Sequence, residues 1–151
     1  MVIVNSIMAS LHHIAAFTVA ACLVYEFVAY RQNLTVAEAR NIQRVDLAYG
    51  IAAGLVLVVG FLRVYFFEKG SPYYFSNHIF WTKIVLFMIV GLLSIDPTIR
   101  YIRWNRQIGA GQAPVVSEAE FRRTRLILTL EIVGIVVILL AAPMMARGIG
   151  M

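Results

Sequence analysis

Apolar residues fill four long stretches of the chain, and polar residues gather in the short segments between them. The stretches cover about residues 4–30, 45–67, 78–99 and 124–146. Each is long enough for a membrane-spanning helix, which needs about 20 apolar residues. None alternates apolar and polar side chains with a period of two, as a strand of a membrane barrel does. The pattern therefore predicts four transmembrane helices.

The polar segments before the second and fourth stretches carry helix-start signals. Thr35 is followed three residues later by Glu38, which is the spacing of a capping box. Ser117 precedes an acidic first turn, which is favourable at a helix N-terminus. The connections are too short for a soluble domain. We therefore expect one transmembrane domain over residues 1–151, an all-α, antiparallel four-helix bundle.

The composition indicates that the solvent of these helices is a lipid bilayer. Hydrophobic residues make up 61% of the 151 positions, only 14% are charged, and the mean hydropathy is +0.81. A soluble domain of this length cannot hide so much apolar surface. The first stretch lacks the basic segment and the cleavage motif of a signal peptide, so we expect it to be retained. The single Cys22 excludes an internal disulfide and a cysteine-based metal site.

Basic residues are unevenly divided between the two ends of the expected helices. Nine of the 13 lysines and arginines belong to the first and third connections: Arg31, Arg40, Arg44, Arg100, Arg103, Arg106, Arg122, Arg123 and Arg125. The positive-inside rule places these connections in the cytoplasm and both termini on the outer, periplasmic side. The net charge of +5 suits anionic lipid headgroups and requires no nucleic-acid partner.

Two adjacent histidines and two cations stand in the outer halves of the expected helices. His12 and His13 interrupt the first apolar stretch, and Arg63 and Lys83 lie toward the outer ends of the next two. Neutral imidazole is a common haem ligand, and arginine and lysine bind carboxylates such as porphyrin propionates. Adjacent helical residues point about 100° apart, so we expect at most one of the two histidines to bind iron. The alternative is that the histidines hydrogen-bond to neighbouring helices while the two cations reach the membrane surface.

The third histidine does not suit a haem site with two histidine ligands. His78 begins its own span, whereas His12 lies about nine residues into the first, so their depths differ by about 10 Å. One histidine with an open, water or methionine sixth position fits better. Met88 has a suitable depth for that methionine, but core packing is the explanation that we favour for it.

Four charged residues form a second group, toward the cytoplasmic side and the middle of the expected bundle. Charged side chains in a membrane helix are costly and usually have partners, so we expect structural ion pairs here. Protonation of the deepest residue, Glu131, and a role in proton transfer are the alternative. Gly50 and Gly54 form a small-xxx-small pattern, which predicts close helix packing. The four charged residues are Glu26, Arg44, Asp46 and Glu131.

Several segments resemble a bacterial family of predicted four-helix membrane proteins of unknown function. They are LHHIAAF, RVDLAYGIAAGLVLVVGFLRVYFFEKG and FWTKIVLFMIVGLLSI, and the likeness spans almost the whole chain. A more distant resemblance is to membrane protoporphyrinogen oxidases that bind haem b and to copper-resistance D-type proteins. It rests on an early Leu-His dipeptide and on a tryptophan shortly before a lysine, here Trp81 and Lys83. This resemblance implies a haem ligand at His12 or His13 and a functional lysine at Lys83.

We therefore expect a multi-pass protein of the bacterial inner (cytoplasmic) membrane with a haem b or porphyrin site near its outer face. Membrane electron transfer or porphyrin oxidation is the activity that such a site supports, and whether the protein is an enzyme stays open. The main alternative is a non-catalytic accessory subunit of a larger membrane complex, or a homo-oligomer. A transporter of metal ions or small solutes fits less well, because four helices form a narrow pore and no carboxylate–histidine set shares one depth.

Overall fold

The chain folds into four long helices joined by short connections. The computed structural model describes residues 2–67, 70–147 and 149–150, and within these ranges it contains helices and no strand. The prediction of an all-helical chain is confirmed. The long helices are α1 (Val2–Ala29), α2 (Val36–Leu62), α4 (His78–Arg103) and α6 (Glu118–Ala146). The short elements are the π-helix η1 (Arg63–Phe67), α3 (Ser71–Phe75) and α5 (Asn105–Gly109).

Four helical segments are long and apolar enough to cross a membrane, which confirms the prediction of four membrane-length helices. The π-helix prolongs the second segment and α5 prolongs the third. The segments cover Ile3–Ala29, Val36–Phe67, His78–Gly109 and Glu118–Met145.

Local signals explain why α2 and α6 begin well before their apolar stretches. The Thr35 side chain accepts a hydrogen bond from the Glu38 backbone, and the Glu38 carboxylate accepts one from the Thr35 backbone. Ser117 and Glu120 form the same reciprocal pair at the start of α6. Each capping box satisfies N–H groups that the first turn leaves without helical partners. The amphipathic lead-in segments are therefore the first turns of the long helices.

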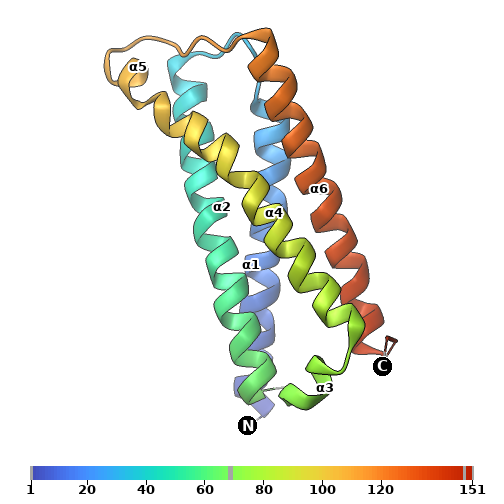
Figure 1. The fold of residues 1–151 in the computed structure, drawn as a ribbon. Coiled ribbons are helices and arrows are strands. Elements are labelled where there is room, and N and C mark those ends of the chain that lie inside the picture. Colours follow the sequence, from blue (N-terminus) through green and yellow to red (C-terminus); the bar gives the residue numbers. More distant parts are fainter. Residues whose placement is uncertain (1, 68–69, 148, 151) are drawn as a thin grey trace.

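The long helices pack in a bundle whose two ends differ in character. Figure 1 shows consecutive long helices running in opposite directions, with both termini at one end, here called the termini end. The other end, here called the arginine-rich end, carries Arg31, Arg40, Arg44, Arg100, Arg103, Arg106, Arg122 and Arg123. Helix α1 packs most extensively against α2, and α4 packs most extensively against α6. At the second of these contacts a Cβ on Gly134 would stand 2.6 Å from Val90 Cγ2, so the close approach of α4 and α6 requires glycine.

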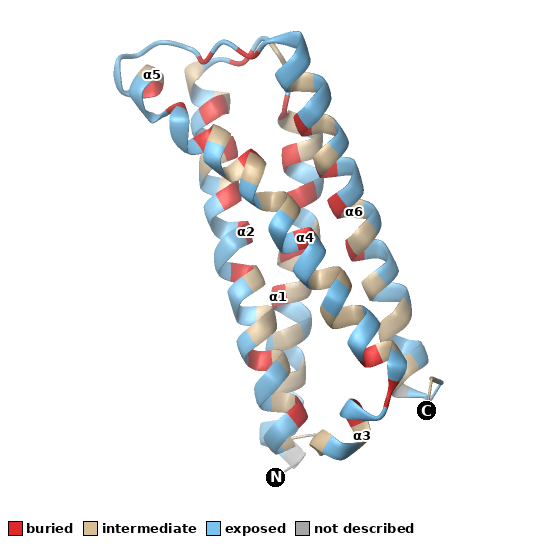
Figure 2. Ribbon diagram, viewed as in Figure 1, coloured by how far each residue is buried: buried red, intermediate tan, exposed pale blue. Residues whose placement is uncertain are grey.

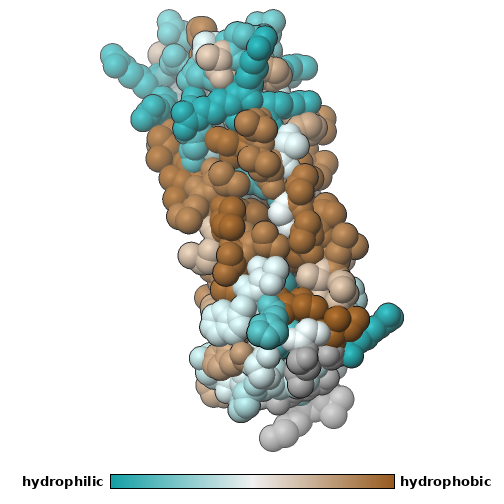
Figure 3. Space-filling model, turned by 45° about the vertical axis from the view of Figure 1, so that its right-hand side comes forward, coloured by the Kyte–Doolittle hydropathy of each residue, from teal (hydrophilic) through white to brown (hydrophobic). Residues whose placement is uncertain are grey.

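The outward faces of the bundle are apolar, as a lipid-facing surface must be. Buried residues line the inward sides of the helices in Figure 2, and most positions that face outward are exposed. Figure 3 shows a hydrophobic band around the middle and a hydrophilic cap at the arginine-rich end. Large apolar side chains such as Val28, Leu92 and Leu140 are 64–72% exposed. A bilayer supplies the apolar contacts that the single chain leaves open.

The glycine pattern on α2 does not pack as its spacing predicts. A Cβ on Gly50 or on Gly54 would meet no atom of the described chain within 4 Å. These glycines therefore lie on the outer surface of α2 rather than at a contact within the bundle. The close approach on α2 occurs instead at Gly60, where a Cβ would stand 3.1 Å from His12 Cε1.

Candidate functional site

A cavity of about 590 Å³ lies between the long helices toward the termini end. A smaller cavity of about 150 Å³ adjoins it and shares many of its lining residues. The larger volume lies within the roughly 300–1,000 Å³ range of small-molecule sites. His12, Arg63 and Lys83 line both cavities and His13 lines the larger one, so the structure brings together all four residues that the sequence assigns to a cofactor.

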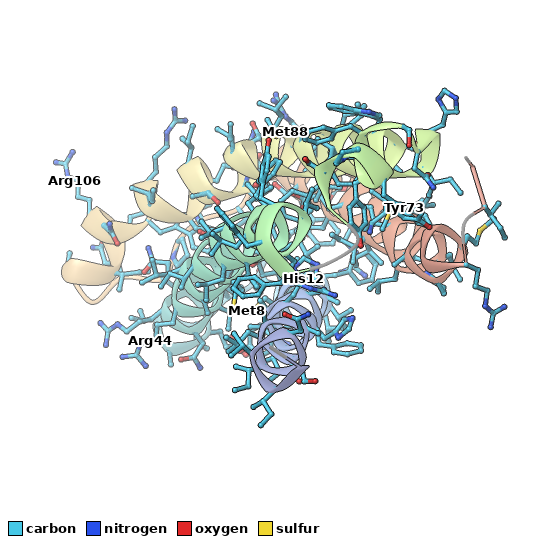
Figure 4. All side chains as sticks on the ribbon, turned by 90° about the horizontal axis from the view of Figure 1, so that it is seen from below. Met8, His12, Arg44, Tyr73, Met88 and Arg106 are labelled. Atoms are coloured by element: carbon cyan, nitrogen blue, oxygen red, sulfur yellow. The ribbon has the colours of Figure 1, made fainter. Side chains whose placement is uncertain are left out.

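His12 enters the cavity from α1 and rests against α2. It is half-buried, and in Figure 4, which looks along the bundle from the termini end, it lies among the long helices. Its Nδ1 atom is buried without a hydrogen-bond partner among the described residues, although the ring faces the Val56 carbonyl. Gly60 lies directly beside the ring and provides the space that it occupies. The contact fixes one edge of the imidazole against α2.

The other two histidines differ from His12 in exposure and direction. His13 is exposed and lines only the larger cavity, with its ring centroid 6.2 Å from that of His12 at an angle of 65°. His78 is exposed at the start of α4 and lines neither cavity. The two adjacent histidines therefore reach the larger cavity in different directions, His12 half-buried and His13 exposed, as the 100° step of a helix requires.

Two cations stand beside His12 and come from different elements. Arg63 begins η1, where the helix widens to the π form that often occurs at functional sites. Lys83 comes from the second turn of α4 and makes no ion pair with a described residue. Arg63 and Lys83 are close enough to interact electrostatically with each other and with the His12 ring. A cavity with this lining attracts an anion.

The remaining walls of the cavity are aromatic or apolar. Val56, Phe87 and Ile138 come from α2, α4 and α6, and Tyr73 and Tyr74 of α3 close the termini end. Basic groups and an apolar surface together suit an amphipathic anion, whose ring or chain is apolar and whose acidic groups are charged.

Met145, not Met88, is the methionine that lines the cavity. The sequence suggested Met88 because of its depth in the expected membrane helix. Met88 is 52% exposed and lies on the outer side of α4 in Figure 4, so it does not line either cavity. Met145 of α6 lines both cavities, and depth counting had missed it. The rotation of each helix about its axis decides which of the two faces inward, and a single sequence leaves that rotation open.

The second group of charged residues lies inside the bundle between the cavity and the arginine-rich end. Glu26 is 2% exposed, Asp46 is 9% exposed, and Glu131 is fully buried. Thr98 donates a hydrogen bond of 2.7 Å to Asp46. None of the three carboxylates forms an ion pair with a described residue, and Arg44 is exposed and points away from the bundle in Figure 4. The carboxylates thus face one another rather than Arg44.

The ion pairs that the structure does contain lie at the arginine-rich end. Arg100 binds Asp96 at 2.9 Å and Glu120 at 3.0 Å, and Arg123 binds Asp96 at 2.9 Å. Arg122 binds Glu118 at 2.6 Å on the surface of α6. The Arg100–Glu120 and Arg123–Asp96 pairs tie α4 to α6 near the connections, which is the structural role that the sequence analysis expected from the second group.

Comparison with known proteins shows which family the chain belongs to. Residues 4–150 match a family described as predicted membrane protein (DUF2214). The chain belongs to this family. Among curated proteins and among solved structures nothing matches the chain. The resemblance to haem-binding oxidases and to copper-resistance D-type proteins therefore receives no support from these comparisons. Family membership and the four membrane-length helices together identify an integral membrane protein.

Proposed function

We propose that this membrane protein binds haem b, or a closely related porphyrin with carboxylate groups, in the cavity at the termini end. The observation that carries the proposal is the convergence of His12, Arg63 and Lys83 from three elements on one cavity with apolar walls. A porphyrin matches all three features, because it has a metal centre, an apolar ring and acidic side chains.

Each lining residue has a defined task in this proposal. Gly60 and the Val56 carbonyl hold one edge of the His12 ring, which leaves Nε2 as the nitrogen that can face iron. Arg63 is suited to bind one carboxylate in a bidentate manner, and Lys83 is suited to bind the other as a point charge. The apolar walls exclude water from the ring. When bound, haem supplies redox chemistry for electron transfer or porphyrin oxidation.

The positive-inside rule gives the orientation that goes with this function. We place the arginine-rich end in the cytoplasm of a bacterial cell and both termini on the outer side of the inner membrane. The helices then form an antiparallel bundle with the cavity in its outer half. A redox partner or a porphyrin substrate reaches the cavity from that side.

Two neighbouring histidines supply a matched pair of variants. The purified protein is freed of endogenous ligand, placed in lipid nanodiscs and titrated with haem, and the Soret absorbance is followed. We expect saturation at one haem per chain for the wild type and for His13→Ala, and loss of the saturable component for His12→Ala. Equal binding by both variants would refute the assignment of His12. Saturable binding by none of the three proteins would refute the haem proposal.

The outer surface of α2 favours a second candidate function, that of a subunit packed against another membrane helix. Gly50 and Gly54 leave open space beside exposed Leu47 and Ile51, and small residues of this spacing allow close helix approach in lipid. The partner is a second copy of the chain or a helix of a larger complex. Light scattering in mild detergent tests the first case. A mass above one chain that Gly54→Leu reduces to one chain supports it, and a monomeric wild type excludes it.

A further inference from the structure

The buried carboxylates Glu26, Asp46 and Glu131 form a centre to which every long helix contributes. Glu26 comes from α1, Asp46 from α2 and Glu131 from α6, and α4 adds the hydroxyl of Tyr101. The three carboxyl groups are close enough to interact electrostatically. Among the described residues no set of three histidine, cysteine, aspartate or glutamate side chains is arranged to hold a metal ion. The centre is separate from the haem proposal and does not depend on it.

The polar atoms of this centre have too few partners. Both carboxylate oxygens of Glu131 and Oε1 of Glu26 are buried without a hydrogen bond from a described residue. The hydroxyl groups of Tyr101 and Thr124 are buried in the same way, and both residues are 0% exposed. Such atoms are rare in folded proteins and call for an explanation, such as a functional role, ordered water or a bound ion.

Two arginines of α4 and α6 are engaged elsewhere. Arg125 donates to the Phe27 carbonyl at 2.5 Å, and its guanidinium stands 3.8 Å over the Phe27 ring. Arg100 is paired with Asp96 and Glu120 at the arginine-rich end. No arginine or lysine of the described chain pairs with Glu26 or Glu131, so their negative charges would stand uncompensated in a low dielectric.

The other groups that face the two glutamates are neutral or acidic. Cys22 on α1 and Tyr49 on α2 interact with this centre, as do Asp46 and Tyr101. None of them supplies a positive charge. A proton on each glutamate removes the unpaired charge and gives each carboxyl a donor for a neighbouring oxygen.

A line of polar groups leads from the centre to the arginine-rich end. Tyr30 lies near Thr124 and interacts with the charged network around Arg100. Its ring packs against that of Tyr101, with centroids 6.0 Å apart. In the opposite direction Val19 and Ile135 line the cavity, and these apolar side chains carry no hydroxyl or carboxyl group. Among the described residues, the hydroxyl groups of Tyr30, Thr124 and Tyr101 therefore lead from the centre toward the arginine-rich end.

We propose that Glu26 and Glu131 form a proton-binding site inside the membrane that exchanges with water at the arginine-rich end. Tyr30, Thr124 and Tyr101 carry the proton between water and the glutamates. No bond other than those to the transferred proton forms or breaks, and no electron moves. The site lets the protein take up and release protons from one side of the membrane.

Infrared spectroscopy of the protein in nanodiscs tests the site directly, because protonated carboxyl groups absorb separately from carboxylates. At neutral pH we expect a carboxylic C=O band that shifts in D₂O. Glu26→Gln and Glu131→Gln should each remove part of this band. The matched control Glu118→Gln lies on the exposed surface of α6, paired with Arg122, and should leave the band unchanged.

Three results would overturn the proposal. The first is a wild-type spectrum at neutral pH without a protonated carboxyl, and the second is a band that survives in Glu26→Gln and Glu131→Gln. The third is a change of the carboxylate bands on adding Na⁺ or K⁺ at constant pH, because it would show that the site holds a metal cation. Glutamine is close in shape to a protonated glutamate, so failure of these variants to fold would also contradict neutral glutamates.

The route is tested by the rate of deuterium exchange at the same band. Tyr30→Phe removes the hydroxyl nearest the arginine-rich end and should slow the exchange. His13→Ala, at the cavity, should not alter it. Slowing by His13→Ala without slowing by Tyr30→Phe would show that protons arrive from the cavity side and would overturn the proposed route.

Discussion

Gly60 offers a test of the His12 site that changes no polar group. In Gly60→Ala the new methyl group would stand 3.1 Å from His12 Cε1 and 3.5 Å from Nδ1. The ring must then move by a few tenths of an ångström. Without ligand it moves toward the cavity at little cost, but a ring bound to iron is held in place.

The expected loss of haem affinity follows from the strain in the His12 ring when it is bound to iron. A side chain held about 30° from its preferred rotamer costs about 0.5–1.5 kcal/mol. The affinity for haem should therefore fall about two- to tenfold in Gly60→Ala. The free energy of unfolding should change by no more than about 1 kcal/mol, because alanine also favours the helix.

Gly54→Ala is the matched control, because it lies on the same helix and its methyl group meets nothing within 4 Å. We expect wild-type haem affinity for this variant. Affinities are measured by Soret titration in nanodiscs, and unfolding is followed by circular dichroism. Wild-type affinity in Gly60→Ala, or equal loss in both variants, would refute the contact between Gly60 and a ligand-binding His12.

Three further predictions concern packing, charge and capping. Gly134→Ala places a methyl group 2.6 Å from Val90 Cγ2 and should lower the free energy of unfolding by about 1–3 kcal/mol, whereas Gly91→Ala, with open space around it, should not. Lys83→Gln should weaken the binding of a carboxylate ligand and make it less sensitive to salt, with wild-type thermal stability. Ser117→Ala removes the cap of α6 and should cost about 0.5–2 kcal/mol in chemical unfolding. Unchanged stability in Gly134→Ala would contradict the close packing of α4 and α6.

The helices and their caps could be predicted because their causes are local. A run of about 20 apolar residues is sufficient to predict a span, and a Thr-x-x-Glu sequence is sufficient to predict a helix start. The depth of His12, Arg63 and Lys83 follows from counting residues along helices of known direction. The sequence alone could therefore predict that these three residues lie at a similar depth in the bundle.

Helix rotation and lateral contacts could not be predicted in this way. Arg44 stands two residues before Asp46, a step of about 200° around the helix, so the two side chains point to opposite sides. Their similar depth in the membrane had suggested an ion pair between Arg44 and Asp46. Similarly, Gly54 and Gly60 are both glycines on α2, and only the placement of α1 shows that Gly60 has a partner in the bundle while Gly54 has none. For the same reason the sequence suggested Met88 as a cavity residue, whereas the structure places Met145 there.

The absorption spectrum of the protein purified from membranes with ample haem precursor tests the central proposal most directly. The account predicts one haem b per chain, a Soret band that shifts on reduction with dithionite, and loss of this band in His12→Ala but not in His13→Ala. A folded protein that remains colourless under these conditions would contradict it.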